Sequence, residues 1–179
     1  MSRVLNLNAE PLGDAVYIGR RSARRGLAGS DFANPYQIPR DGTRVQVIEQ
    51  YRRWLSKQPN LLRRLRELRG HRLACYCRPL PCHGDVLSEF VDADELLEQL
   101  AAAGITAVAR EGMIRLSPAA KITKAVSDRV RPLKQAILPL LTLRQAEQIP
   151  AEEHPLVAHA AKIFNARITK IVPPARQLA

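Results

Sequence analysis

The sequence predicts an α/β fold, a small Rossmann-like three-layer domain followed by a small α+β domain. Two short apolar segments, residues 15–19 (AVYIG) and 72–76 (RLACY), are typical of buried strands. A long polar loop and helical patterns separate them, and another helical pattern follows. This is the order of an α/β layer with parallel strands. We expect domains at residues 1–90 and 92–143 and a tail at 144–179 with a short helix and a strand.

The composition and the net charge limit the kinds of molecule that the protein is expected to bind. Hydrophobic residues make up 46% of the chain, and no apolar run approaches the roughly 20 residues that cross a bilayer. The N-terminal residues lack the pattern of a signal peptide, so we expect a cytoplasmic protein with reduced thiols and no membrane partner. Residues 1–90 carry 16 Lys and Arg against 8 Asp and Glu, most of the +11 net charge. This favours a nucleotide or a nucleic acid as partner, although an arginine-rich composition alone is the alternative.

The first predicted domain has recognisable helix signals. After a long loop over residues 20–42, Thr43 and Gln46 form a capping box that starts a helix. A second helix is predicted from Asn60 to the stop at Gly70, and a third over residues 84–90. Because ligands of parallel α/β folds lie at the carboxyl ends of the strands, we expect the long loop and the 77–83 turn to share one rim.

The second predicted domain begins with a capping box at Asp92 and Glu95. Residues 105–118 predict a hairpin that turns at residues 111–112, and a helical pattern starts at Thr123. Pro132 lies inside that pattern, so we expect a kink or two short helices there.

All three cysteines lie in residues 72–87 (RLACYCRPLPCHGDVL), for which four interpretations compete. One is a zinc site of Cys75, Cys77, Cys82 and His83, against which we count that adjacent side chains project in different directions. The others are a redox pair, small buried residues, and a ligand or catalytic pocket at a helix N-terminus, where amide groups attract anions and favour thiolate. We favour the pocket; no cofactor is predicted, and zinc is kept as the alternative.

Residues 14–90 resemble an uncharacterised family of bacterial and phage proteins. The resemblance rests on VYIG, an Asn-Pro turn, an Asp-Gly-Thr helix start, and Cys-x-Cys followed by Pro-Cys-His-Gly-Asp. It implies no activity, but it implies one shared site. With Arg21 added as a second phosphate contact beside Arg20, the candidate catalytic residues are Cys82, His83 and Asp85, and the candidate ligand-binding residues are Tyr17, Gly19, Arg20, Arg21, Asn34, Pro35, Asp41, Cys75 and Cys77.

Residues 93–142 resemble the small N-terminal docking domain of tubulysin-type peptide synthetases, with leucine-patterned helices around a hairpin. Similar modules accompany plasmid and phage replication proteins. The resemblance implies a docking-like domain over residues 92–143 that binds a protein partner.

Two functions follow as hypotheses. In the first, a nucleotide- or nucleic-acid-associated protein of phage or mobile-element type binds or processes a phosphate-bearing ligand at the Cys/His/Asp pocket. Arg20 and Arg21 would contact phosphate, and Asn34 the base or sugar. Asp41 or Asp85 would act as acid, base or orienter for His83, and Cys77 or Cys82 as nucleophile only if a thiolate is stabilised. In the second, the protein is a non-catalytic basic adaptor that binds DNA and recruits a partner protein. One version of this hypothesis has the adaptor stabilised by zinc. Whether the protein is an enzyme is left open.

Overall fold

The computed structural model describes residues 3–148, together with residues 159, 162 and 163. The chain forms two compact units, Met1–Thr142 and Leu143–Ala179, and the site lies in the first. The predicted helix and strand of the tail lie outside the described residues, apart from short pieces. No helix in the described part of the chain is both long and apolar enough to cross a membrane.

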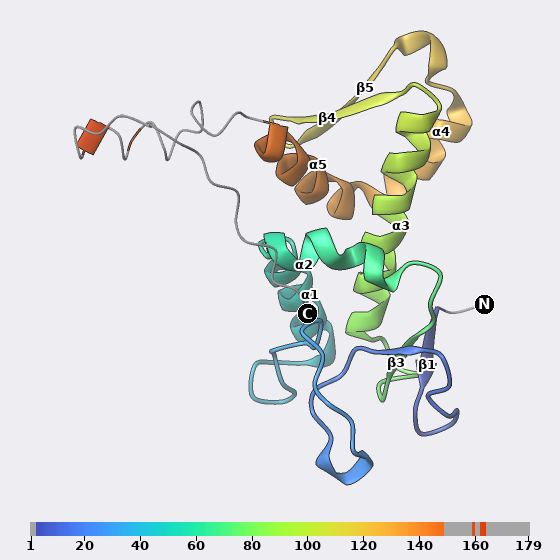
Figure 1. Ribbon diagram of the computed structural model, residues 1–179, viewed down its shortest axis with the longest axis vertical. Coiled ribbons are helices and arrows are strands. Elements are labelled where there is room, and N and C mark those ends of the chain that lie inside the picture. The colour runs from blue at the N-terminus through green and yellow to red at the C-terminus, as the bar shows by residue number, and fades with distance from the viewer. Residues whose placement is uncertain (1–2, 149–158, 160–161, 164–179) are drawn as a thin grey trace, which may run out of the picture. The chain divides into compact units, whose positions relative to one another are not determined.

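A small parallel sheet lies at the base of the site. It consists of β1 (Val4–Asn6), β2 (Val16–Tyr17) and β3 (Leu73–Cys75), in the order β1-β3-β2. β3 is central and pairs in parallel with both neighbours, β1 lying directly beside it (Figure 1). The two predicted strands are therefore confirmed as parallel neighbours. Sequence reasoning missed β1, because three residues are too short to show a period.

Helix α1 (Arg44–Leu55) begins where the capping box predicted. The Gln46 side chain accepts a hydrogen bond from the Thr43 amide at 2.8 Å, and the Thr43 hydroxyl accepts one from the Gln46 amide at 3.4 Å. One face of the helix buries Val47, Tyr51 and Leu55, at the spacing of successive turns. α1 therefore presents a fixed N-terminus to the site.

The next helical segment differs from the prediction at its start. Helix α2 (Pro59–Arg63) begins before Asn60, with Gln58 as an N-cap that makes no side-chain bond. It tightens into the 3-10 helix η2 (Arg64–Leu68), and Gly70 follows with a φ of 72°. Proline suits the first helical position because it lacks the amide hydrogen that would be unpaired there. The leucines of both segments are buried, as predicted.

Helix α3 (His83–Ala102) is one continuous helix (Figure 1), which corrects the prediction of a helix over 84–90 and a new start at Asp92. Its buried residues recur at helical spacing along one face from His83 to Leu100. Asp92 pairs with Arg3 at 2.7 Å and caps nothing. A capping-box pattern is also an ordinary i, i+3 pair on a helix surface, and the continuous apolar face decides between the two. The division at residues 90–92 stays a prediction.

The remaining elements follow the sequence pattern. Strands β4 (Thr106–Arg110) and β5 (Met113–Ser117) form the predicted antiparallel hairpin, whose turn residues Glu111 and Gly112 have φ of 52° and 71°. Such left-handed pairs make the tight turns that match strand twist. Helix α4 (Lys124–Val130) leads through a 3-10 turn, Arg131–Leu133, into α5 (Lys134–Gln148), which confirms the break at Pro132. The described part of the chain is thus mixed α/β with two small sheets; the three-layer arrangement stays a prediction.

Candidate functional site

A cavity of about 430 Å³ opens at the carboxyl ends of β2 and β3. The long loop after β2, the turn after β3 and the first turns of α1 all contribute to it. The geometry thus brings both predicted loops to one place. The lining side chains and backbone come from Tyr17, Gly19, Arg20, Arg21, Ser22, Asn34, Tyr36, Ile38, Arg44, Val47, Ile48, Cys75, Tyr76, Cys77, Pro81 and His83.

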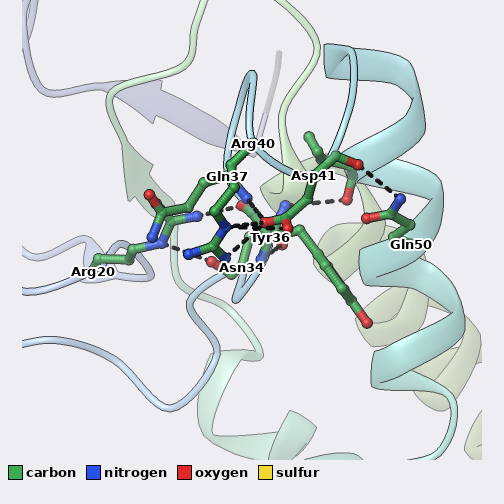
Figure 2. Close-up of polar contacts among 8 residues, drawn as sticks. Arg20, Asn34, Tyr36, Gln37, Arg40, Asp41 and Gln50 are labelled. Atoms are coloured by element: carbon green, nitrogen blue, oxygen red, sulfur yellow. Dashed lines mark hydrogen bonds and ion pairs between the residues drawn. The ribbon is translucent and has the colours of Figure 1, made fainter.

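Arg20 and Asn34 shape the long loop from inside (Figure 2). Arg20 donates from Nε to the Asn34 carbonyl at 2.8 Å and from Nη2 to the Tyr36 carbonyl. The Asn34 side chain accepts from the Tyr36 amide at 2.9 Å and donates to the Val47 carbonyl at 3.3 Å. The two Arg20 bonds satisfy loop carbonyls that lack a strand partner, and the Asn34–Val47 bond ties the loop to α1. The two residues therefore position the loop in addition to lining the cavity.

Gly19 packs closely against the Tyr17 side chain at the start of the loop. A Cβ atom there would lie 2.4 Å from the Tyr17 hydroxyl oxygen, far inside contact distance. That hydroxyl donates to the Arg20 carbonyl at 2.6 Å. Burial, followed by Tyr76 and Cys75, raises the pKa of Tyr17 to about 12. The phenol therefore stays protonated and keeps its donor role.

Asp41 and Pro35 belong to the loop but do not line the cavity in the described part of the chain. Asp41 accepts from the Gln37 amide at 2.7 Å and pairs with Arg40 at 2.8 Å, while its carbonyl accepts from Gln50 at 3.0 Å (Figure 2). The hydrogen bond from Arg40 and then that from Gln37 lower the pKa of Asp41. Asp41 therefore holds the end of the loop in place next to α1.

Apart from the cysteines and His83, the charged side chains that line the cavity are arginines: Arg20, Arg21 and Arg44. No described Asp or Glu lines it. Arg44 donates to the Pro81 carbonyl at 3.3 Å and so joins α1 to the turn after β3. Arg44, Tyr36, Tyr76 and Pro81 also line the cavity and were not predicted as site residues. The only local signal for Arg44 was its place directly after the Thr43 cap.

The cysteines and His83 form a compact cluster at the inner wall of the cavity. The Cys75 sulfur lies 3.5 Å from the Cys77 sulfur and 3.9 Å from His83 Nδ1, and the Cys82 sulfur lies 3.6 Å from that nitrogen. All four candidate ligand atoms lie within 4.8 Å of one another, so the cluster could hold a metal ion.

The geometric argument against a metal is therefore wrong. Cys82 is the N-cap of α3, with an extended backbone (φ −131°, ψ 150°), and His83 is the first helical residue. The change of backbone conformation between them turns both side chains to the same point. Burial lowers the pKa of His83, but the Cys75 and Cys77 sulfurs raise it more, to about 9. Hydrogen bonds from Cys77 and Cys82 lower the pKa of Cys75, and the hydrogen bond to Cys75 raises that of Cys82. In the metal-free protein the first thiolate is therefore Cys75.

Asp85 lies behind this wall and does not line the cavity. It completes a capping box by accepting from the Cys82 amide at 2.9 Å, and it pairs with Arg78. The Arg78 carbonyl in turn accepts from Asn6 at 2.6 Å. These contacts give Asp85 a structural explanation, the support of the first turn of α3. Cys82 is likewise absent from the lining.

Comparison with known proteins gives matches without a known activity. The model of a domain of unknown function (DUF4326) matches residues 6–93. A 28-residue stretch is 54% identical to the "Uncharacterized 12.4 kDa protein in nrdA-td intergenic region" of Enterobacteria phage T4, and it covers 16% of this chain and 26% of that protein. No solved structure matches the chain significantly. The matched domain spans β2, the long loop, α1, β3 and the start of α3, which together build the whole cavity.

Proposed function

We propose that the cavity binds a phosphate-bearing ligand of the nucleotide class. The observation that carries the proposal is the charge of the lining, which has three arginines and no carboxylate among the described residues. Guanidinium groups without acidic partners attract phosphate, because charge-assisted hydrogen bonds are among the strongest available. The +8 net charge of residues 1–90 adds a long-range attraction for anions.

The three arginines have different parts in this proposal. Arg21 is exposed, and its side chain makes no hydrogen bond or ion pair with any residue that the structure describes, so it is available to a phosphate. Arg20 uses Nε and Nη2 for loop carbonyls, which leaves Nη1 for a ligand. Arg44 is tethered by one Nη1 bond to Pro81, and its remaining donors can complete the phosphate contacts.

The rest of the lining suits the apolar face of a base. Tyr36 and Tyr76 are half-buried, and Ile38, Val47 and Ile48 also line the cavity. Its volume of about 430 Å³ is within the range of small-molecule sites. Aromatic side chains stack on any base, which favours the nucleotide class without choosing among the bases. The side-chain amide of Asn34 is already hydrogen-bonded to the backbone of Tyr36 and Val47, so we assign Asn34 to positioning the loop rather than to recognising the base.

The proposal is for binding, and no chemical step is assigned. Cys77 is the half-exposed cysteine of the lining, and Cys82 and Asp85 lie outside it. The alternative, a basic DNA adaptor, has less support because two of the arginines that would contact DNA are already engaged. Arg64 pairs with Asp31 and Glu67, and Arg25 donates to the Leu7 carbonyl. A protein partner for residues 92–143 stays a prediction.

Calorimetric titration of the full chain with the four ribonucleoside monophosphates, ribose 5-phosphate and inorganic phosphate tests the proposal. We expect a nucleoside monophosphate to bind more tightly than inorganic phosphate. Arg21→Gln should weaken binding about tenfold, since a hydrogen bond to a charged group is worth about 1.5–3 kcal/mol. Arg66→Gln, an exposed arginine outside the cavity, removes the same charge and should change affinity less than about twofold. Equal losses in both variants, or no binding by the panel, would contradict the proposal.

A further inference from the structure

We infer that Cys75, Cys77, Cys82 and His83 bind one Zn²⁺ ion in a closed four-ligand site at the wall of the cavity. Zinc bonds of about 2.3 Å to sulfur and about 2.0 Å to nitrogen, in a tetrahedron, separate neighbouring ligand atoms by about 3.6–3.8 Å. The three measured separations, 3.5, 3.6 and 3.9 Å, lie around those values. The cluster therefore needs only small adjustments to receive the ion.

His83 is already oriented as a metal ligand. Its Nε2 lies 2.9 Å from the Ile18 carbonyl and donates its proton to that oxygen, so Nδ1, the atom facing the sulfurs, is the nitrogen that gives up its proton to bind a metal. Metal-binding histidines are usually fixed by such a hydrogen bond from the other ring nitrogen. The Tyr51 ring packs edge-on against the imidazole with centroids 5.2 Å apart, which holds its plane. These contacts therefore fix the orientation of the ring and the proton on Nε2 before a metal binds.

The helix N-terminus supports the negative charge of the ligands. The Gly84 amide donates to the Cys82 sulfur at 3.3 Å, as amides do to metal-bound thiolates. A zinc ion with three thiolates carries a net charge of −1, which the positive end of α3 stabilises. Binding releases the protons that the four ligands still carry, and all the ligands come from the end of β3, the turn after it and the start of α3.

The ligand set selects zinc among the common metals. Thiolate and imidazole in a tetrahedron favour zinc or an iron–sulfur cluster. A cluster of several iron atoms holds its cysteines farther apart than the 4.8 Å limit seen here, so the site fits a single ion. Four protein ligands leave no open position for water or substrate, which is the arrangement of structural zinc. The ion would therefore fix Cys75, Cys77 and His83 in the cavity wall and perform no step itself.

Metal analysis of the full chain tests the inference directly. Purified protein should contain about one zinc ion per chain. After removal of the metal, Co²⁺ should give the intense visible bands of a tetrahedral thiolate site, and Zn²⁺ should displace it. Zinc should also protect all three cysteines from alkylation, as read by mass spectrometry. Unprotected thiols at saturating Zn²⁺, the absence of a thiolate cobalt spectrum, or iron that zinc cannot displace would overturn it.

A matched pair of histidine variants completes the test. His83→Asn should lower zinc affinity at least about 100-fold, since loss of a residue that only hydrogen-bonds to a metal ligand already lowers metal affinity about 10–100-fold. His71→Asn, at an exposed position outside the cluster, should bind as the unmodified chain does. If His83→Asn fails to fold, the cobalt and alkylation results on the unmodified chain decide. The inference goes beyond the proposed function: zinc content and nucleotide affinity are separate measurements, and either can fail alone.

Discussion

The two walls of the cavity are held in different ways. The loop wall, residues 19–43, is shaped by hydrogen bonds from polar side chains, and Arg20 and Arg21 are exposed. The cluster wall, residues 75–84, buries Cys75, Cys82, His83 and Gly84 against the sheet and α1. Exposed polar contacts contribute little to stability, whereas buried groups contribute much. Changes in the loop wall should therefore alter ligand affinity, and changes in the cluster wall should alter folding.

Removal of the inferred zinc should give the largest difference between the walls. Loss of a structural metal removes its binding free energy from the folded state. A loss of only about 3 kcal/mol lowers the melting temperature of a chain this size by about 10 °C. We expect a strong chelator to produce at least that shift in calorimetry, and added Zn²⁺ to reverse it. Arg21→Gln, in the loop wall, should leave the melting temperature within about 1 °C. Equal shifts would erase the distinction between the walls.

A glycine in the cluster wall should give the next largest effect. A Cβ at Gly84 would lie 2.8 Å from Ile18 Cδ1 and 3.0 Å from Val4 Cγ2, both buried. Overpacking of this kind costs about 1–3 kcal/mol, of which the better helix propensity of alanine returns about 1 kcal/mol. Gly84→Ala should therefore lower the free energy of unfolding by about 1 kcal/mol in urea titration. Gly26→Ala, at a loop position with open space around it, tests only the cost of its positive φ. A stabilised Gly84→Ala variant would show that the core there is loosely packed.

Arg20→Lys should disturb the loop wall locally. The guanidinium reaches the carbonyls of Asn34 and Tyr36 together, and a single ammonium group cannot reproduce that fork. We expect a loss of about 1 kcal/mol, confined to the loop, as one hydrogen bond to an exposed carbonyl is lost. Hydrogen exchange of amides in residues 30–37 should accelerate about fivefold, while those of α3 stay unchanged. Arg24→Lys, an exposed arginine with no side-chain contact in the described part, is the control. Acceleration in α3 as well would mean that the loop is part of the core.

Local signals predicted the start of α1 and the shared rim, whereas other features depended on contacts between distant segments or on backbone angles. The Thr43–Gln46 capping box lies within four residues, so its pattern specifies its geometry. The same capping-box pattern at Asp92 wrongly predicted a helix start. Only the continuous apolar face, packed against other elements, shows that α3 continues through this position. The side chains of Cys82 and His83 point to the same place because of the backbone angles at Cys82. The spacing of the cysteines and the histidine in the sequence does not predict those angles. Arg44 and Tyr36 reach the cavity only through the folding of the loop over α1.

The smallest expected effect is a pH dependence at the base of the loop wall. Arg40 and the Gln37 amide hold the pKa of Asp41 below its usual value near 4, with Arg20 as a weaker influence. A carboxyl whose pKa is lower in the folded state stabilises the fold above its unfolded pKa, and this contribution disappears as the pH falls through the folded pKa. Asp41→Asn should therefore lower the melting temperature slightly at pH 7, and the difference from the unmodified chain should vanish toward pH 2. Asp14→Asn, at an exposed position, is the control for the loss of one carboxylate. A difference that persisted in acid would mean that Asp41 supports the loop through its shape and not through its charge, and the loop wall would then resemble the cluster wall more closely than its exposure indicates.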